Sequence, residues 1–173
     1  MLHRPNLRLG RLQKVLSRVV AASFILASLA AAGSASSQQD RAAEYKEKYE
    51  HETDPVRKAR ALGNYGDWQV SEFVRQANAN EFQAAFTTLT DYRNEVRTVF
   101  DALKARGVNA ERKPDGFKEL EIHLDKALWK LDRAAVLVPF GARPAFQDIR
   151  DELGRIHNEL IHMLFPRGPG GGL

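Results

Sequence analysis

The chain has 173 residues, of which 43% are hydrophobic and 28% are charged, a composition typical of globular proteins and not of disordered ones. It contains no cysteine, which excludes disulfides, thiol catalysis, zinc–thiolate sites and covalently attached c-type haem. The net charge is +4, but residues 1–35 contain five basic and no acidic side chains. Residues 36–173 carry 21 basic and 22 acidic side chains, which is too little positive charge for a nucleic-acid-binding surface.

Residues 1–35 have the three-part pattern of a secretory signal peptide. Residues 1–18 are positively charged, and residues 19–32 (VVAASFILASLAAA) form an uninterrupted run of apolar and small residues. Small residues then occupy positions 33–35, where signal peptidase selects its cleavage site. The pattern predicts export to the periplasm or the extracellular space, with contact to a membrane only through this segment.

The apolar run has 14 residues. As a helix it is about 21 Å long, which is short for a hydrocarbon core about 30 Å thick. We therefore predict cleavage after Ala35, with Ala32 as the alternative site. Retention of the segment as an uncleaved membrane anchor is a further alternative.

Apolar residues recur every three or four positions through the rest of the chain, which is typical of amphipathic helices. The charged segment 36–53 is expected to be helical, with Tyr45 and Tyr49 as its only large apolar side chains. Four longer helices follow, and Gly107 is expected to end the second. Their expected core residues are Ala59, Leu62, Val70, Phe73 and Ala77 in the first; Phe82, Ala85, Leu89, Tyr92, Val96, Val99 and Leu103 in the second; Phe117, Leu120, Leu124, Ala127, Leu131, Ala134 and Val138 in the third; and Phe146, Ile149, Leu153, Ile156, Leu160 and Met163 in the fourth.

Helix-start signals are clear at two places. Asp54-Pro55 predicts the start of the first long helix, with Asp as the N-cap and Pro in the first turn. Asn80 is expected to cap the second, with Gln83 completing a capping box. Gly63 and Gly66 weaken the middle of the first helix. They indicate either that a neighbouring backbone comes close or that the helix bends.

These elements predict an all-α fold, an antiparallel four-helix bundle with an additional charged N-terminal helix. The bundle is expected over residues 54–166, after the charged segment 36–53 and before a disordered tail, 167–173. The alternative is a pair of stacked helical hairpins, because residues 79–89 resemble the second-helix entry of a tetratricopeptide repeat. That resemblance implies stacked helix pairs and is limited to these residues.

Three residues are weak metal-ligand candidates. Glu159 and His162 match the Glu-x-x-His element that ferritin-like bundles use twice, but the chain has no second copy. At about 100° per residue, His162 points away from the apolar stripe of its own helix. His123 lies at the edge of another stripe and is expected to form a surface pair with Glu119. No metal site and no cofactor is predicted.

The sequence also lacks the patterns of nucleophilic catalysis. It contains no G-x-S-x-G turn and no glycine-rich loop after a strand. We predict no catalytic residue, although an enzyme stays open as an alternative, because paired carboxylates are not recognisable in one sequence.

Ile122, Trp129 and Val136 recur at steps of seven on the helix whose core stripe is already complete without them. Each lies roughly 145–175° from the centre of that stripe, so this helix is apolar on two opposite faces. Either the segment 36–53 covers the row, with Tyr45 and Tyr49 against Trp129, or the row binds another protein or a second copy of this chain.

The sequence therefore favours an exported helical bundle that acts by binding, as an interaction or structural module. A metal- or cofactor-binding bundle or an enzyme is one alternative, and a membrane-anchored protein with an uncleaved signal is another.

The signal-peptide prediction is tested by the intact mass of the protein recovered from the exported fraction of its own host. We expect a polypeptide that begins at Ser36, or at Gly33 if cleavage follows Ala32. A full-length mass in the membrane fraction would instead support the anchor.

Overall fold

The computed structural model describes residues 40–166, so the predicted signal peptide and the expected disordered tail lie outside the described residues. The chain divides into two units, Met1–Ala43 and Glu44–Leu173. Of the first unit only residues 40–43 are described, and they are helical. The architecture below is that of the second unit.

The described part of the second unit consists of helices joined by turns and loops and contains no strand, which confirms the predicted all-α fold. The first long helix begins as predicted, because the Asp54 carboxylate accepts a hydrogen bond from the backbone N–H of Arg57 at 2.9 Å. Residues 44–51 are helical and precede the long helices. The elements that follow are α2 (Pro55–Asn78), α3 (Phe82–Ala105), α4 (Phe117–Ala134), the short 3₁₀ turns η1 (Ala135–Leu137) and η2 (Phe140–Ala142), and α5 (Arg143–Leu164).

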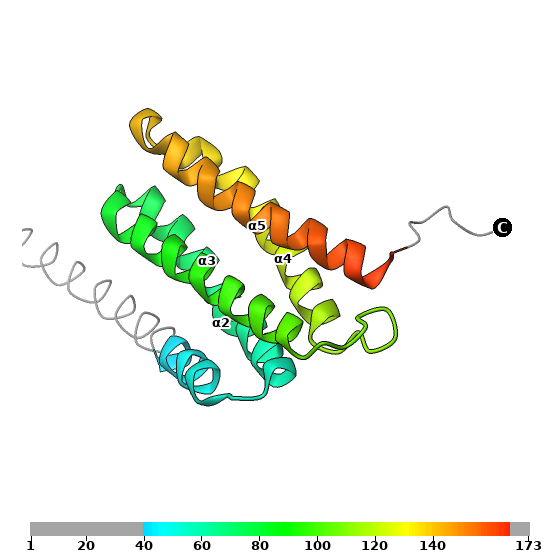
Figure 1. Cartoon of the computed structure of the whole chain (residues 1–173). Helices are drawn as coiled ribbons and strands as arrows, with labels where there is room; N and C mark the ends of the chain where they lie inside the picture. The colour runs from blue at the N-terminus through cyan, green and yellow to red at the C-terminus, as the bar shows by residue number, and fades with distance from the viewer. Residues whose placement is uncertain (1–39, 167–173) are drawn as a thin grey trace, which may run out of the picture. The chain divides into compact units, whose positions relative to one another are not determined.

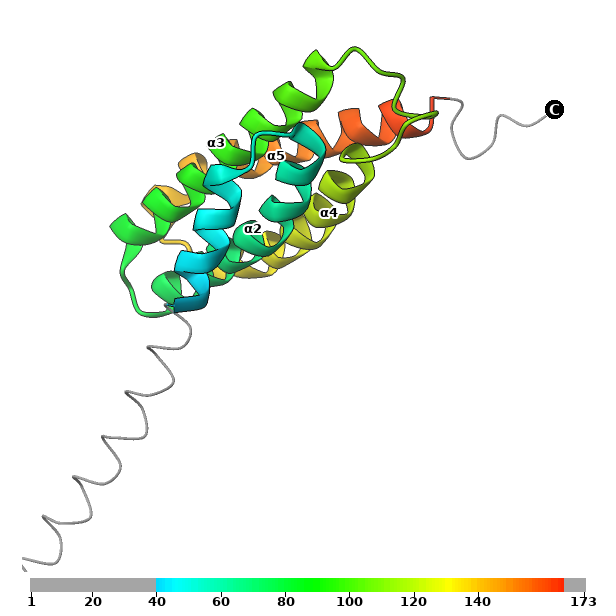
Figure 2. The same ribbon diagram turned by 90° about the horizontal axis from the view of Figure 1, so that it is seen from below.

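The four long helices form two antiparallel hairpins, α2–α3 and α4–α5, which lie side by side (Figures 1 and 2). Helix α2 packs against α4, and α3 packs against α5. The facing helices run parallel: Arg60 Nε of α2 meets Glu119 of α4 at 2.9 Å near the start of both, and Lys130 Nζ meets Asp67 at 3.0 Å further along. The predicted four-helix bundle is confirmed. Helices that follow one another within a hairpin are antiparallel, whereas the facing helices of the two hairpins are parallel.

The predicted apolar stripes form one continuous core. Every residue expected in them is buried except Phe82 and Met163, which are half-buried. Leu164 takes the inward position at the end of α5, one residue beyond the expected one. Periodicity alone therefore located most of the core. It misplaced residues at two helix ends and missed buried residues inside the helices, such as Tyr65, Phe100 and His123.

The expectation that Asn80 caps α3 is wrong. Asn80 has a left-handed backbone with φ of 61°, and Glu81 is the N-cap residue of α3 without a side-chain cap. The N–H of Glu81 donates to the carbonyl of Gln76 at 2.9 Å, and the N–H of Asn80 donates to that of Ala77 at 3.1 Å. This pair of bonds is a Schellman motif, in which asparagine tolerates the left-handed position. Asn80 therefore ends α2 instead of beginning α3.

The segment 44–51 packs against α2. Tyr49 is buried, and its ring centroid lies 5.6 Å from that of Tyr65, which in turn stacks on Trp68 at 5.9 Å. The expectation that this segment places its tyrosines against Trp129 is therefore wrong. The reason is that Tyr65 and Trp68 give α2 a second aromatic surface, on which Tyr49 is buried.

Gly66 marks a close contact between three helices. A Cβ atom at this position would lie 2.6 Å from Nε2 of His123 on α4 and 2.8 Å from Cε2 of Tyr92 on α3. At Gly63, one turn earlier, a Cβ atom would meet nothing within 4 Å. The sequence indicated either a close neighbouring backbone or a bend in the helix. At Gly66 the neighbours are close, but they are side chains and not backbone.

Gly66→Ala and Gly63→Ala should therefore change stability in opposite directions. Gly66→Ala should destabilise the fold by about 1–3 kcal/mol, because His123 and Tyr92 must move to make room. Gly63→Ala should stabilise it by up to about 1 kcal/mol through helix propensity. Urea unfolding measures both, and equal shifts would show that the contact at Gly66 has no energetic role.

Candidate functional site: the groove between α2 and α4

The predicted row lies on the outer face of α4 and on η1. Ile122 is 41% exposed, Trp129 is 61% exposed and Val136 is 80% exposed. They are three of the five large apolar side chains that are exposed in the described part of the chain. The segment 44–51 packs elsewhere, so no described segment buries the row.

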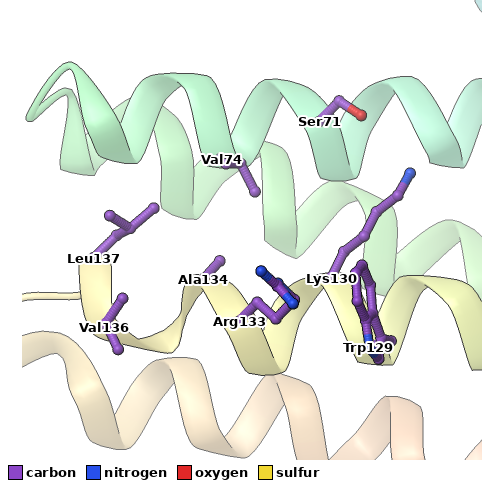
Figure 3. Close-up of a pocket in the computed structure, with 8 residues that line it drawn as sticks. All are labelled: Ser71, Val74, Trp129, Lys130, Arg133, Ala134, Val136 and Leu137. Carbon is purple, nitrogen blue, oxygen red and sulfur yellow. The ribbon is translucent and has the colours of Figure 1, made fainter.

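A hollow of about 350 Å³ lies between α2 and α4 beside this row (Figure 3). In Figure 3, Ser71 and Val74 of α2 lie across from Lys130 and Leu137 of the α4–η1 segment. The complete lining is Ser71, Val74, Trp129, Lys130, Arg133, Ala134, Val136 and Leu137. The hollow therefore offers mainly apolar surface, with positive charge at its edge.

Arg133 contributes to the site through its position on Trp129. The centre of its guanidinium lies 4.7 Å from the centroid of the indole ring, a cation–π contact that also holds the charge beside the apolar surface. Lys130, by contrast, is already paired with Asp67 at 3.0 Å. The two cations therefore differ, and of this pair only Arg133 has its charge available to a partner.

A second hollow, of about 320 Å³, lies further toward the start of α4. Because Gly63 has no side chain, nothing from this position fills it. It is lined by Ala59, Arg60, Gly63, Asn64, Asp67, Glu119, Ile122, His123 and Lys126. Ile122 thus lines one hollow, while Trp129 and Val136 line the other. We call the two hollows, together with the row, the α2–α4 groove.

His123 lines the second hollow but is buried, with 5% exposed, so the expectation of a surface histidine paired with Glu119 is wrong. Its Nε2 and the Tyr92 hydroxyl are hydrogen bonded at 3.1 Å, and burial lowers its pKa to about 4. The Glu119 carboxylate instead accepts from Arg60 at 2.9 Å. The ring enters the core because Gly66 leaves it space.

The three weak metal-ligand candidates are not brought together. Glu159 pairs with Lys104 across α3 and α5, and His162 is exposed as predicted. His123 lies inside the bundle beside Tyr92. Within residues 40–166 no group of three histidine, aspartate or glutamate side chains is arranged to hold a metal ion.

No helix among these residues combines the length and apolar character needed to cross a bilayer.

Sequence reasoning missed one perturbed carboxyl group, that of Glu95 on α3. Its Oε2 is buried without a hydrogen-bond partner, as is Oε1 of Gln69. Burial raises the pKa of Glu95 to about 7, with further raising by Asp91 and Glu50 and opposing effects of Gln69 and Lys46. The sequence carried no signal for this, because the segment 44–51, which supplies Lys46 and Glu50, reaches Glu95 only through tertiary packing.

Comparison of the chain with models of known protein families, with curated proteins and with solved structures gives no match. Function is therefore inferred from the residues of the groove and from the sequence patterns.

Glu95→Gln should alter the pH dependence of stability. The folded pKa of Glu95, about 7, lies above the usual 4.5, so the folded state binds this proton more tightly than the unfolded state does. The resulting stabilisation is complete below pH 4.5 and is lost as the pH rises through 7. Glutamine imitates the protonated acid. The melting temperature of the variant should therefore be close to that of wild type at low pH and higher than that of wild type at about pH 8.

Circular dichroism melts at the two pH values measure this difference. The exposed Glu47→Gln provides the control, because it removes a carboxyl group that is not buried. A difference in melting temperature between Glu95→Gln and wild type that is the same at both pH values would contradict the raised pKa of Glu95.

Proposed function

We propose that this protein is an exported helical bundle that acts by binding another polypeptide along the α2–α4 groove, and not by catalysis. The observation that carries the proposal is the exposed Ile122–Trp129–Val136 row beside an apolar hollow. Exposed apolar surface of this kind marks interaction sites, because leaving it in contact with water costs free energy that a partner recovers.

The residue types in the groove also support binding. Tryptophan and arginine are enriched among the residues that dominate binding energy, and here Trp129 and Arg133 are in contact. The seven-residue spacing places Ile122 and Trp129 along one face of α4, and Val136 follows on η1. A helix from a partner, laid in the groove, would meet the three side chains in succession.

The proposed location rests on the N-terminal sequence pattern. A basic stretch, a short apolar run and small residues come in the order of a signal peptide. The absence of cysteine and the near-neutral charge of residues 36–173 are compatible with a binding protein of the periplasm or the extracellular space.

Site-specific photo-cross-linking in the host tests the proposal. A photoreactive amino acid at position 136, where Val136 is 80% exposed, should give an adduct with one polypeptide, identified by its mass. The adduct should disappear when Trp129→Ser is added, because the central apolar contact is lost. Circular dichroism should show that this variant still folds, since Trp129 is largely exposed.

The same photoreactive group at position 98 is the matched control, because Thr98 is exposed on α3, away from the groove. Adducts at position 136 that equal those at position 98, or that persist with Trp129→Ser, would contradict binding through the groove.

A further inference from the structure

We propose that the partner is a second copy of this chain, bound with the two α4 helices antiparallel about a two-fold axis at Trp129. The proposal rests on the proposed function, because it names the occupant of the same groove. Its basis is the arrangement of charge on the outer face of α4, where Asp125 and Arg133 lie one turn before and one turn after Trp129.

These two side chains have opposite charge, and both are exposed. Neither forms an ion pair with any side chain in residues 40–166, and Arg133 contacts only the indole ring of Trp129. Lys126, next to Asp125, is likewise exposed and without an ion pair among the described residues. Free charges of both signs therefore surround the exposed tryptophan.

The other charged residues of α4 that lie near the row are already used within the monomer. Lys130 is paired with Asp67 of α2, and Asp132 is paired with Arg150 of α5 at 2.8 Å. Glu121 faces His157 of α5 at 3.4 Å. The unpaired charges are thus confined to the strip along the row, where an intermolecular contact would meet them.

A two-fold axis that crosses α4 at Trp129 pairs each residue before it with the residue equally far after it in the other copy. Asp125 of each copy then lies opposite Arg133 of the other copy. The dimer therefore contains this pair of opposite charges twice. Lys126 likewise lies opposite Asp132, whose carboxylate also pairs with Arg150 of its own copy.

The apolar residues follow the same symmetry, since Ile122 of one copy lies opposite Val136 of the other. Trp129 lies against Trp129 at the centre. A parallel arrangement would instead place Asp125 beside Asp125 and Arg133 beside Arg133, and like charges in contact are unfavourable. The charge pattern therefore selects the antiparallel dimer.

Sedimentation velocity over a concentration series, on the protein as its host processes it, tests the dimer. Wild type should dimerise reversibly. Asp125→Arg and Arg133→Asp should each weaken the dimer by about tenfold or more, because each creates two like-charge contacts. The double variant Asp125→Arg/Arg133→Asp should regain wild-type affinity to within about threefold, since it restores both pairs with their signs exchanged.

Two further variants separate this interface from effects on folding. Trp129→Glu should abolish the dimer while the thermal melt of the monomer stays unchanged, because the side chain is 61% exposed. Arg112→Asp, in the loop before α4, reverses an exposed charge away from the row and should leave the dimer intact.

A double variant that stays as weak as the single variants would overturn the proposed register. A wild-type protein that is monomeric at all concentrations would overturn self-association. If the Trp129-dependent cross-link from position 136 then leads to a different polypeptide, binding through the groove stands and only the identity of the partner is wrong. If that cross-link is also absent, both proposals fail.

Discussion

The contact at Gly66 is the constraint on which the bundle depends. Because this residue has no side chain, His123 of α4 and Tyr92 of α3 both reach the surface of α2, where a Cβ atom would lie within 2.8 Å of each ring. Their hydrogen bond, at 3.1 Å, joins the two hairpins inside the core. It also satisfies two polar groups that would otherwise be costly to bury. The glycine thus fixes how closely α2 lies against α3 and α4.

The same side-by-side packing creates the groove. Helices α2 and α4 run parallel, and the ion pair between Asp67 and Lys130 links them between the two hollows. The charges that face α2 or α5 are largely neutralised within the monomer, whereas those next to Trp129 are not. This division separates the charges that hold the helices together from those that stay without an ion pair on the outer face of α4.

Burial has opposite electrostatic consequences at His123 and Glu95. It disfavours the charged form of each, which lowers the pKa of the histidine to about 4 and raises that of the carboxyl to about 7. Between about pH 4.5 and 6.5, rising pH therefore increases stability through His123 and decreases it through Glu95. The two contributions are opposite in sign and partly cancel, so a variant of one residue is needed to separate them.

The sequence by itself determined the helices, the core stripes and the exposed row. This is because helical periodicity assigns each side chain to a face, and because local signals such as Asp54-Pro55 act within one turn. Tertiary structure decided the burial of His123 and the site where Tyr49 packs. Each of these depends on which helix lies against which. A helical projection gives the direction of His123, for example, but the space that receives its ring is the missing side chain of Gly66, 57 residues earlier in the chain. Only the folded chain brings such distant residues together.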